Sequence, residues 1–161
     1  MKKPYLIPIA CLLLSLTFYS AHSQGNNYFS VNHVQSSVQK QADSLKTLYA
    51  ADGFQLLKEA AINMESEYEL PVVVPLTEGS WYQFVFIGEY TSKLYEVRMY
   101  DWNEKMVVYQ KKQWGEIDGN IISFSYIPKF SEFHMIKPLQ VNKEKKKNLK
   151  GYVMLFKKTA K

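Results

Sequence analysis

The feature that most limits the fold of this chain is the alternation of apolar and polar residues from position 54 onward. Successive side chains of a β-strand point to opposite faces, so a period of two indicates strands with one buried face. After the turn signal Asp118-Gly119-Asn120, for example, Ile122, Phe124 and Tyr126 share one face. No helical segments alternate with these runs, which argues against a parallel sheet of βαβ units.

About eight extended segments follow one another, separated by Gly, Pro, Asn and Asp turn signals. They cover residues 54–64, 72–74, 80–87, 93–100, 105–110, 122–126, a segment beginning at 133, and 151–158. Short strands at such spacing indicate an antiparallel sandwich or barrel. We expect an all-β, antiparallel β-sandwich, jelly-roll-like, with about eight strands and an N-terminal α-helix.

Three of these segments have ambiguous or restricted positions. Residues 54–64 fit a helix or a strand, and we favour a strand because Gly53 ends the preceding helix. The segment that begins at Phe133 contains Pro138, whose missing N–H predicts an edge, a bulge or a strand end. Val72–Val74 lies between two prolines, so we expect this strand to be short or near an edge.

A helix is expected before the first strand, after a polar lead-in. Asn32 is suited to cap its start, and Asp52-Gly53 to end it. The apolar stripe of this helix consists of Val31, Val34, Val38, Leu45 and Leu48. A narrow stripe of this kind can support a short coiled-coil dimer. We favour the alternative, in which the helix lies against the sandwich.

The first 23 residues have the layout of a secretory signal peptide. Lys2 and Lys3 precede an apolar run, and Ala21-His22-Ser23 supplies small residues for cleavage. The run is too short to span a bilayer, which takes about 20 residues. We therefore expect a periplasmic or secreted protein with no transmembrane span in the mature chain. The expected organisation is a signal peptide (1–23), a lead-in and helix (24–53) and a β-sandwich domain (54–161).

The lone cysteine, Cys11, lies inside this leader. A lipidated cysteine would follow the apolar core, whereas Leu12–Leu16 come after Cys11, so we favour simple cleavage. The mature chain would then have no disulfide, thiol nucleophile or thiolate metal ligand. We predict no metal and no other cofactor.

Three motifs resemble the bacterial pre-peptidase C-terminal family of exported jelly-roll β-sandwiches. Residues 77–84 are similar to its glycine-then-aromatic start of a core strand, 94–108 to its central hairpin, and 151–155 to its closing glycine–tyrosine strand. The resemblance spans residues 54–158. It implies a noncatalytic accessory or binding module of the kind attached to secreted enzymes.

The sequence after residue 23 contains few candidate catalytic residues. His134 lies in an expected strand, where we predict a surface or partly buried position, and Ser131 would project to the opposite face. Glu65, Glu67 and Glu69 alternate, and on an extended segment they would share one face. Such a cluster can bind Ca²⁺ or supply an acid and a base. We favour a solvated strand end and predict no catalytic residue, with a small carboxylate-dependent hydrolase as the less favoured alternative.

Exposed aromatic side chains are the first class of candidate binding residue. Most Trp, Tyr and Phe side chains are expected in the core and its rim, but Trp102 and Trp114 have polar neighbours and lie beside expected turns. Such rings can stack on sugars or anchor a protein interface. Asp101 precedes Trp102, and we expect its side chain to bond its own backbone in the turn.

A lysine-rich segment is the second class. Residues 137–161 carry nine lysines and one acid, whereas residues 24–136 carry nine basic and fourteen acidic side chains. Lys143, Lys145, Lys146 and Lys147 fall in one expected loop, which can meet anions. We favour a solvated loop, and export argues against nucleic acid. The sequence predicts an exported, noncatalytic binding or interaction module for an unidentified partner, such as an envelope glycan or protein, with carbohydrate binding through exposed Trp as the alternative.

Overall fold

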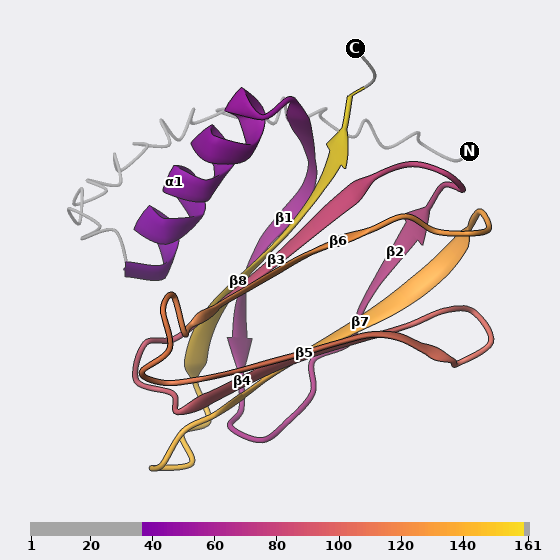
Figure 1. Cartoon of the computed structure of the whole chain (residues 1–161). Coiled ribbons are helices and arrows are strands. Elements are labelled where there is room, and N and C mark those ends of the chain that lie inside the picture. The colour runs from indigo at the N-terminus through magenta and orange to yellow at the C-terminus, as the bar shows by residue number, and fades with distance from the viewer. Residues whose placement is uncertain (1–36, 160–161) are drawn as a thin grey trace, which may run out of the picture. The chain divides into compact units, whose positions relative to one another are not determined.

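The computed structural model describes residues 37–159, which fold as one α-helix and eight β-strands within one compact unit (Figure 1). The helix α1 spans Ser37–Ala51. The strands are β1 (Phe54–Met64), β2 (Val72–Leu76), β3 (Tyr82–Gly88), β4 (Leu94–Tyr100), β5 (Met106–Gln113), β6 (Ile121–Tyr126), β7 (Glu132–Val141) and β8 (Leu149–Lys158). Segment 54–64 is thus a strand, as we predicted.

The strands form two four-stranded antiparallel sheets. One, which we call the covered sheet, has the order β1-β8-β3-β6, and the other, the open sheet, has the order β2-β7-β4-β5. Only the β4–β5 hairpin joins neighbours within a sheet, since every other connection passes to the opposite sheet. This is the strand order of a jelly roll, so the predicted fold class is confirmed.

The main core lies between the two sheets. Phe84 and Phe86 of β3 face inward with Phe124 of β6, and Tyr95 and Val97 of β4 oppose them from the open sheet. The rings of Phe84 and Phe124 have their centroids 5.3 Å apart. The alternation recognised in the sequence is the alternation between this core and the two outer faces.

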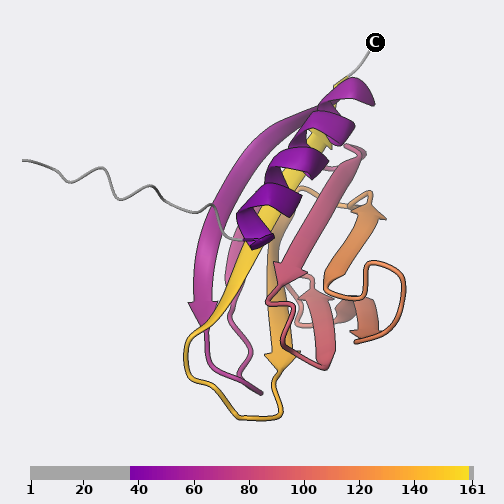
Figure 2. The ribbon, with the colours of Figure 1, turned by 90° about the vertical axis from the view of Figure 1, so that its left-hand side faces the viewer.

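The helix α1 lies over the outer face of the covered sheet (Figure 2), and a second apolar cluster lies beneath it. Val38 and Ala42 of the helix are buried against Val85 and Ile87 of β3 and against β8. Every residue of β3 is therefore buried, because this strand has the core on one face and the helix on the other. Leu45 is half-buried and packs against this cluster.

The helix thus lies on the sandwich, as we favoured, but its stripe differs from the predicted one. Leu48 is exposed, whereas Ala42 and Tyr49, which were not part of the predicted stripe, pack in the cluster beneath the helix. Val31, Val34 and the expected cap Asn32 lie outside the described residues. At the other end, Gly53 has the left-handed φ of 74° expected of a residue that ends a helix.

Two prolines lie within strands. Pro75 is in β2, a short edge strand, as we expected for the segment that begins at Val72. Pro138 is in β7, which is an interior strand, so the prediction of an edge strand is wrong for β7 as a whole. The register explains how it is tolerated: β2 pairs with β7 only up to Ile136, so the missing N–H falls where the neighbouring strand has ended.

Between residues 37 and 159, the one helix is too short and too polar to cross a membrane.

Candidate ligand-binding site

The connections of the sandwich gather at two opposite ends. Four of them, residues 65–71, 89–93, 114–120 and 142–148, form what we call the loop end. Backbone hydrogen bonds join them: Ser66 N–H donates to Lys146 O, and Trp114 N–H donates to Lys93 O. The opposite turn end consists of residues 77–81, 101–105 and 127–131. There Gly79 N–H donates to Pro128 O.

Buried polar side chains are concentrated at the loop end. Of eight buried polar or charged residues in the described part of the chain, four lie in these loops (Ser66, Ser92, Asn120 and Asn142), and Gln140 lies in β7 next to them. Each makes hydrogen bonds that cross from one loop or strand to another, because a buried polar group without a partner is costly. Buried side chains therefore hold the loops in place.

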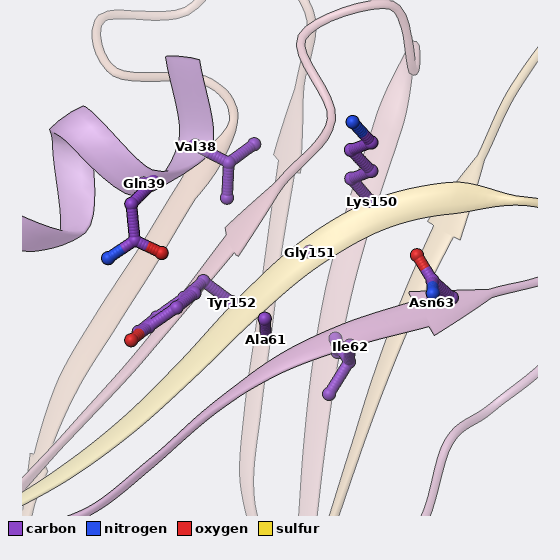
Figure 3. A pocket seen from close by; sticks show the side chains of 8 residues that line it. All are labelled: Val38, Gln39, Ala61, Ile62, Asn63, Lys150, Gly151 and Tyr152. Atoms are coloured by element: carbon purple, nitrogen blue, oxygen red, sulfur yellow. The ribbon is translucent and has the colours of Figure 1, made fainter. Parts of the chain in front are cut away.

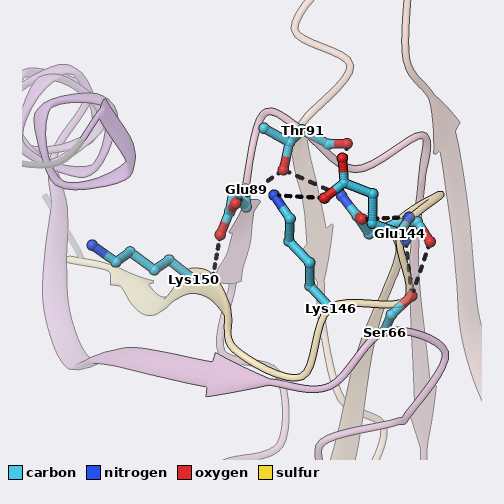
Figure 4. A network of polar contacts seen from close by, with 7 residues as sticks. Ser66, Glu89, Thr91, Glu144, Lys146 and Lys150 are labelled. Carbon is cyan, nitrogen blue, oxygen red and sulfur yellow. Dashed lines mark hydrogen bonds and ion pairs between the residues drawn. The ribbon is translucent and has the colours of Figure 1, made fainter.

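Asn142 is the centre of this network. Its Nδ2 donates to the carbonyl and the hydroxyl of Thr91, and its Oδ1 accepts from Glu144 N–H at 2.9 Å. Its backbone exchanges hydrogen bonds with the Ser66 hydroxyl. Figure 4 shows Ser66, Thr91 and Glu144 converging on this point from three connections. Three of the four loops thus share one anchor.

A hollow of about 320 Å³ opens beside this network, and we call it the Trp114 hollow. It is lined by Gln41, Tyr90, Tyr95, Trp114, Gly115, Glu116, Asp118, Gly119 and Asn120. Trp114 is 61% exposed and Tyr90 is 64% exposed, although they come from different loops. Its volume is at the lower limit of small-molecule sites, which span roughly 300–1,000 Å³.

Buried residues form the floor of the hollow. The Tyr95 hydroxyl donates to the carbonyl oxygens of Glu89 and Ser92 at 2.8 and 2.9 Å. Burial raises the pKa of Tyr95 to about 12, so it stays a neutral donor. Gly88 lies directly against this ring, and a Cβ there would approach Tyr95 to 2.5 Å. The floor therefore needs glycine at this position.

The wall of the hollow is fixed by a pair of amides. Asn120 Nδ2 donates to Gln41 Oε1 at 2.8 Å and to Gly88 O at 3.2 Å, and Gln41 Nε2 donates back to Asn120 Oδ1. Gly119 closes the turn, since a Cβ there would come within 2.6 Å of Gln113 O. Because Gln41 lies on α1, its hydrogen bonds with Asn120 connect the helix to the loop end.

The structure separates the two tryptophans that the sequence selected. Trp114 lies at the loop end, whereas Trp102 lies at the turn end in the β4–β5 turn. The Trp102 ring is 68% exposed and lies against Phe133, with centroids 6.3 Å apart. Asp101 Oδ1 accepts from the N–H groups of Asn103 and Lys105, which confirms the predicted turn. These two tryptophans cannot form one site.

The four candidate lysines are at the loop end, between β7 and β8. Lys143, Lys145 and Lys147 are exposed, while Lys146 is half-buried and its Nζ lies 3.3 Å from Glu144 Oε2 (Figure 4). Glu89 Oε2 accepts from Lys150 N–H at the start of β8. The loop passes from the open sheet to the covered sheet, and Lys143, Lys145 and Lys147 are exposed on it.

The outer face of the open sheet carries an ion-pair network that we did not predict from the sequence. Arg98 binds Glu69 at 2.6 Å and Glu96 at 2.7 Å, and Lys137 lies 3.3 Å from Glu69. The pKa of Arg98 is raised above its usual value, because the hydrogen bond and charge of Glu96 outweigh the opposing effect of burial. These charges neutralise one another across three elements.

This geometry overturns the interpretation of three carboxylates on one face. Residues 65–71 are not extended: Tyr68 N–H donates to Glu65 O in a turn, and Glu67 has a φ of 71°. Glu69 is held by Arg98 and Lys137, while Glu67 faces solvent. The turn disperses the three side chains.

The prediction of a surface or partly buried His134 is also wrong. His134 is 1% exposed, because the β2–β7 register places it beside Val74 on the inward face. Its Nε2 lies 3.2 Å from the Tyr126 hydroxyl, and its Nδ1 has no hydrogen-bond partner. It is a core residue.

A second hollow, of about 200 Å³, lies where the start of α1 meets β1 and β8 (Figure 3). Val38, Gln39 and Tyr152 border it from the helix side. The Tyr152 hydroxyl already donates to Glu59 at 2.8 Å, and no exposed aromatic ring lines this hollow among the described residues. It offers fewer ligand contacts than the Trp114 hollow.

Within residues 37–159, no group of three or more His, Cys, Asp or Glu side chains is arranged to hold a metal ion. Tyr90 and Asp118 were missed as site residues. The turn signal Asp118-Gly119 was visible in the sequence, but only the tertiary structure places it beside Tyr90.

Comparison with known proteins gives no relative that shows a family. No protein-family model and no curated protein matches the chain. Among solved structures, a Bacillus endospore-appendage pilus protein has a TM-score of 0.41 at 9% identity, covering 67% of this chain and 89% of its own. An arabinose-bound α-L-arabinofuranosidase has a TM-score of 0.35 at 10% identity, covering 70% of this chain and 24% of its own. A glycosylation-associated complex from Streptococcus agalactiae has a TM-score of 0.31 at 14% identity, covering 65% and 39%.

Proposed function

We propose that this protein is an exported, noncatalytic binding module that holds its ligand at the loop end of the sandwich. The observation that carries the proposal is the combination of buried anchors and exposed rings. Asn142, Asn120 and Gln140 fix the loops from below, while Trp114 and Tyr90 remain exposed on them. Binding sites work best when such a supporting layer holds the contacting side chains.

The placement of the acidic side chains and of His134 supports a noncatalytic role. A carboxylate-dependent hydrolase needs two carboxyl groups on either side of one bond. Glu65, Glu67 and Glu69 are instead dispersed by a turn, and Glu69 is neutralised by two cations. His134 is enclosed in the core. The carboxylate-dependent hydrolase that we considered therefore lacks its reacting pair at Glu65, Glu67 and Glu69.

Export is supported by the sequence of residues 1–23, which lie outside the described part of the chain. The resemblance to pre-peptidase C-terminal sandwiches supports an accessory role beside secreted proteins. Expression of the whole chain, followed by fractionation and mass measurement, tests export. A protein that starts at Gln24 and is found outside the cytoplasm is the expected result. A cytoplasmic protein that retains Met1 would contradict it.

The binding role is tested with isolated cell envelopes and soluble envelope polysaccharides. A loop-end variant, Trp114→Ala with Tyr90→Ala, is compared with a turn-end variant, Trp102→Ala with Phe130→Ala. Each variant removes two exposed rings, so their effects on folding are matched. We expect binding to be lost only in the loop-end variant. Binding that survives it, or that is lost equally at the turn end, would refute the proposed surface.

A further inference from the structure

We propose that the Trp114 hollow binds an uncharged sugar ring, one unit of a neutral glycan. This inference rests on the proposed function, because it names the ligand class of the same loop end. Four properties carry it: the size of the hollow, its unstacked rings, its excess of hydrogen-bond acceptors and its balance of charge.

The hollow has the dimensions of a site for a small ring. Its volume of about 320 Å³ has a floor of Tyr95 and a wall of Asn120 and Gln41, so it is closed on two sides and open to solvent on the others. A unit within a longer chain can therefore lie in it while its neighbours extend along the loops. Gly88 packs closely against the Tyr95 ring, and Gly119 packs closely against backbone carbonyl oxygens. The shape of the hollow is therefore formed before a ligand binds.

The two rings that border the hollow are available for stacking. Within the described residues, neither Trp114 nor Tyr90 packs against another aromatic ring, whereas Trp81 packs on Phe54 and Trp102 on Phe133. A large ring with few torsions buries much area at little entropic cost. The apolar C–H face of a pyranose offers a surface of matching size, and the polar edge of the same sugar remains free for hydrogen bonds.

The acidic side chains that border the hollow offer free acceptors. Glu116 uses Oε1 to accept from Gln113 N–H at 3.0 Å, which leaves Oε2 without a partner. The Asp118 carboxylate accepts no hydrogen bond from the described residues, and both side chains are exposed. Both Nδ2 hydrogens of Asn120 are engaged, with Gln41 and with Gly88, while Gln41 Nε2 uses one of its two hydrogens on Asn120. A ligand that brings donors can bind the free carboxylate oxygens, and sugar hydroxyls supply several donors on one edge.

The charges favour a neutral ligand. Glu116 and Asp118 repel anions, which argues against an acidic sugar or a phosphate in the hollow itself. The ammonium group of Lys112 lies 3.5 Å from the backbone carbonyl oxygens of Ile117 and Asp118, so a positive charge lies on this acidic turn and weakens its attraction for a cation. A neutral polyol meets the acceptors without opposing either charge.

The experiment uses the protein purified after export, with an array of neutral oligosaccharides built from glucose, galactose, mannose, xylose and N-acetylglucosamine. Any array hit is then titrated by calorimetry at low and high salt. One matched probe pair is included throughout: N-acetylglucosamine hexamer and its de-N-acetylated form, which differ by amine charge. We expect a neutral oligosaccharide to bind with an affinity that salt does not change.

Variants place the ligand. Trp114→Ala should weaken binding by about tenfold or more, as expected for a central aromatic contact. Asp118→Asn should weaken it by a smaller factor, and Trp102→Ala should leave it unchanged. Binding only of the amine form, with an affinity that falls as salt rises, would mean a cationic ligand and overturn the inference. So would glycan binding that Trp114→Ala does not affect.

The inference and the proposed function fail in different ways. If no oligosaccharide binds but envelopes still bind through the loop end, the sugar assignment is wrong and the proposed function stands. If neither glycans nor envelopes bind, both are wrong. Release of shortened sugar during the titration would contradict the noncatalytic role, whatever the affinity.

Discussion

The two ends of this sandwich hold their connections in different ways. At the loop end, buried side chains reach from one connection to the next, as Asn142 does toward Thr91 and Glu144. At the turn end, Asp101 closes its own turn, and the side-chain bond between connections, from Glu78 N–H to the Ser131 hydroxyl, is exposed. Both ends expose tryptophan, Trp114 at one and Trp102 at the other.

The difference shows that exposure of an aromatic ring is not enough to define a site. Trp102 lies on Phe133 above the outer face of the open sheet, so part of its surface is already used. Trp114 borders a hollow whose floor and wall are fixed and whose acceptors are free. A rigid, partly polar hollow can select a ligand, whereas a ring on a flat face offers contact area but no polar groups that orient the ligand.

The largest expected effect concerns the floor of the hollow. Tyr95→Ala removes a fully buried ring and should lower the free energy of unfolding by about 3–5 kcal/mol. The matched loss of a ring at the turn end, Phe130→Ala, removes a 66% exposed side chain and should cost less than about 0.5 kcal/mol. Urea unfolding measures both. Equal costs would mean that the loop end is no better packed than the turn end.

A smaller effect is expected from the anchor of the loops. Asn142→Ala leaves the Thr91 carbonyl and the Glu144 N–H without their partner, and should cost about 1–3 kcal/mol. Asn103→Ala removes the same amide from an exposed turn position and should cost less than about 0.5 kcal/mol. Hydrogen exchange should also become faster in residues 89–93 in the first variant. If both asparagines cost the same, the side-chain anchor is unimportant.

A third prediction concerns how the stability contributed by the contact between α1 and β1 depends on pH. A hydrogen bond from Tyr152, together with Lys46 3.0 Å away, holds the pKa of Glu59 below its usual value, although partial burial opposes this. A lowered folded-state pKa gives stability that is complete above the unfolded value of about 4.3 and is lost as pH falls through the folded value.

Glu59→Gln should therefore cost less than about 1 kcal/mol at pH 7, because partly exposed ion pairs are weak. The difference from wild type should shrink toward zero as the pH is lowered below about 4. Urea unfolding at a series of pH values measures it. A difference that grows on acidification would show that Glu59 does not stabilise the docked helix as a carboxylate.

The smallest effect is expected for the lysine loop. Replacement of Lys143, Lys145, Lys146 and Lys147 by Gln should change the free energy of unfolding by less than about 0.5 kcal/mol, since these are surface charges. Binding of wild type and variant to anionic vesicles and heparin-like glycans should be equal if the loop is only solvated. A steep, salt-dependent loss in the variant would make the lysine loop a second binding surface.

The strands were predictable because period two follows from local geometry. Gly79 to Gly88 and 118–126 carried both the alternation and the turn signals that bound a strand. The wrong assignments concern residues whose burial depends on a partner far along the chain. His134 is buried because β2 lies beside it, and Leu48 is exposed because α1 packs against β3 and β8 through Val38, Ala42, Leu45 and Tyr49.

The candidate site was predictable in part for the same reason. Trp114 and the lysines could be selected by type and by polar neighbours, but no sequence pattern places Trp114 beside Tyr90 or Gln41. Gln41 and Asn120 are 79 positions apart and meet only because α1 covers the sheet that contains β6. A network of buried amides leaves no spacing pattern in the sequence.

The central claim, that the Trp114 hollow is the ligand site, is tested most directly by the indole N–H signals in a two-dimensional ¹H–¹⁵N NMR spectrum. The chain has three tryptophans, Trp81, Trp102 and Trp114, and the signal of each is assigned by its Trp→Phe variant. During titration with the neutral oligosaccharide that binds best on the array, the Trp114 signal should shift progressively while those of Trp81 and Trp102 stay in place. A titration that moves Trp102 instead, or that leaves Trp114 unmoved at saturation, would contradict the account.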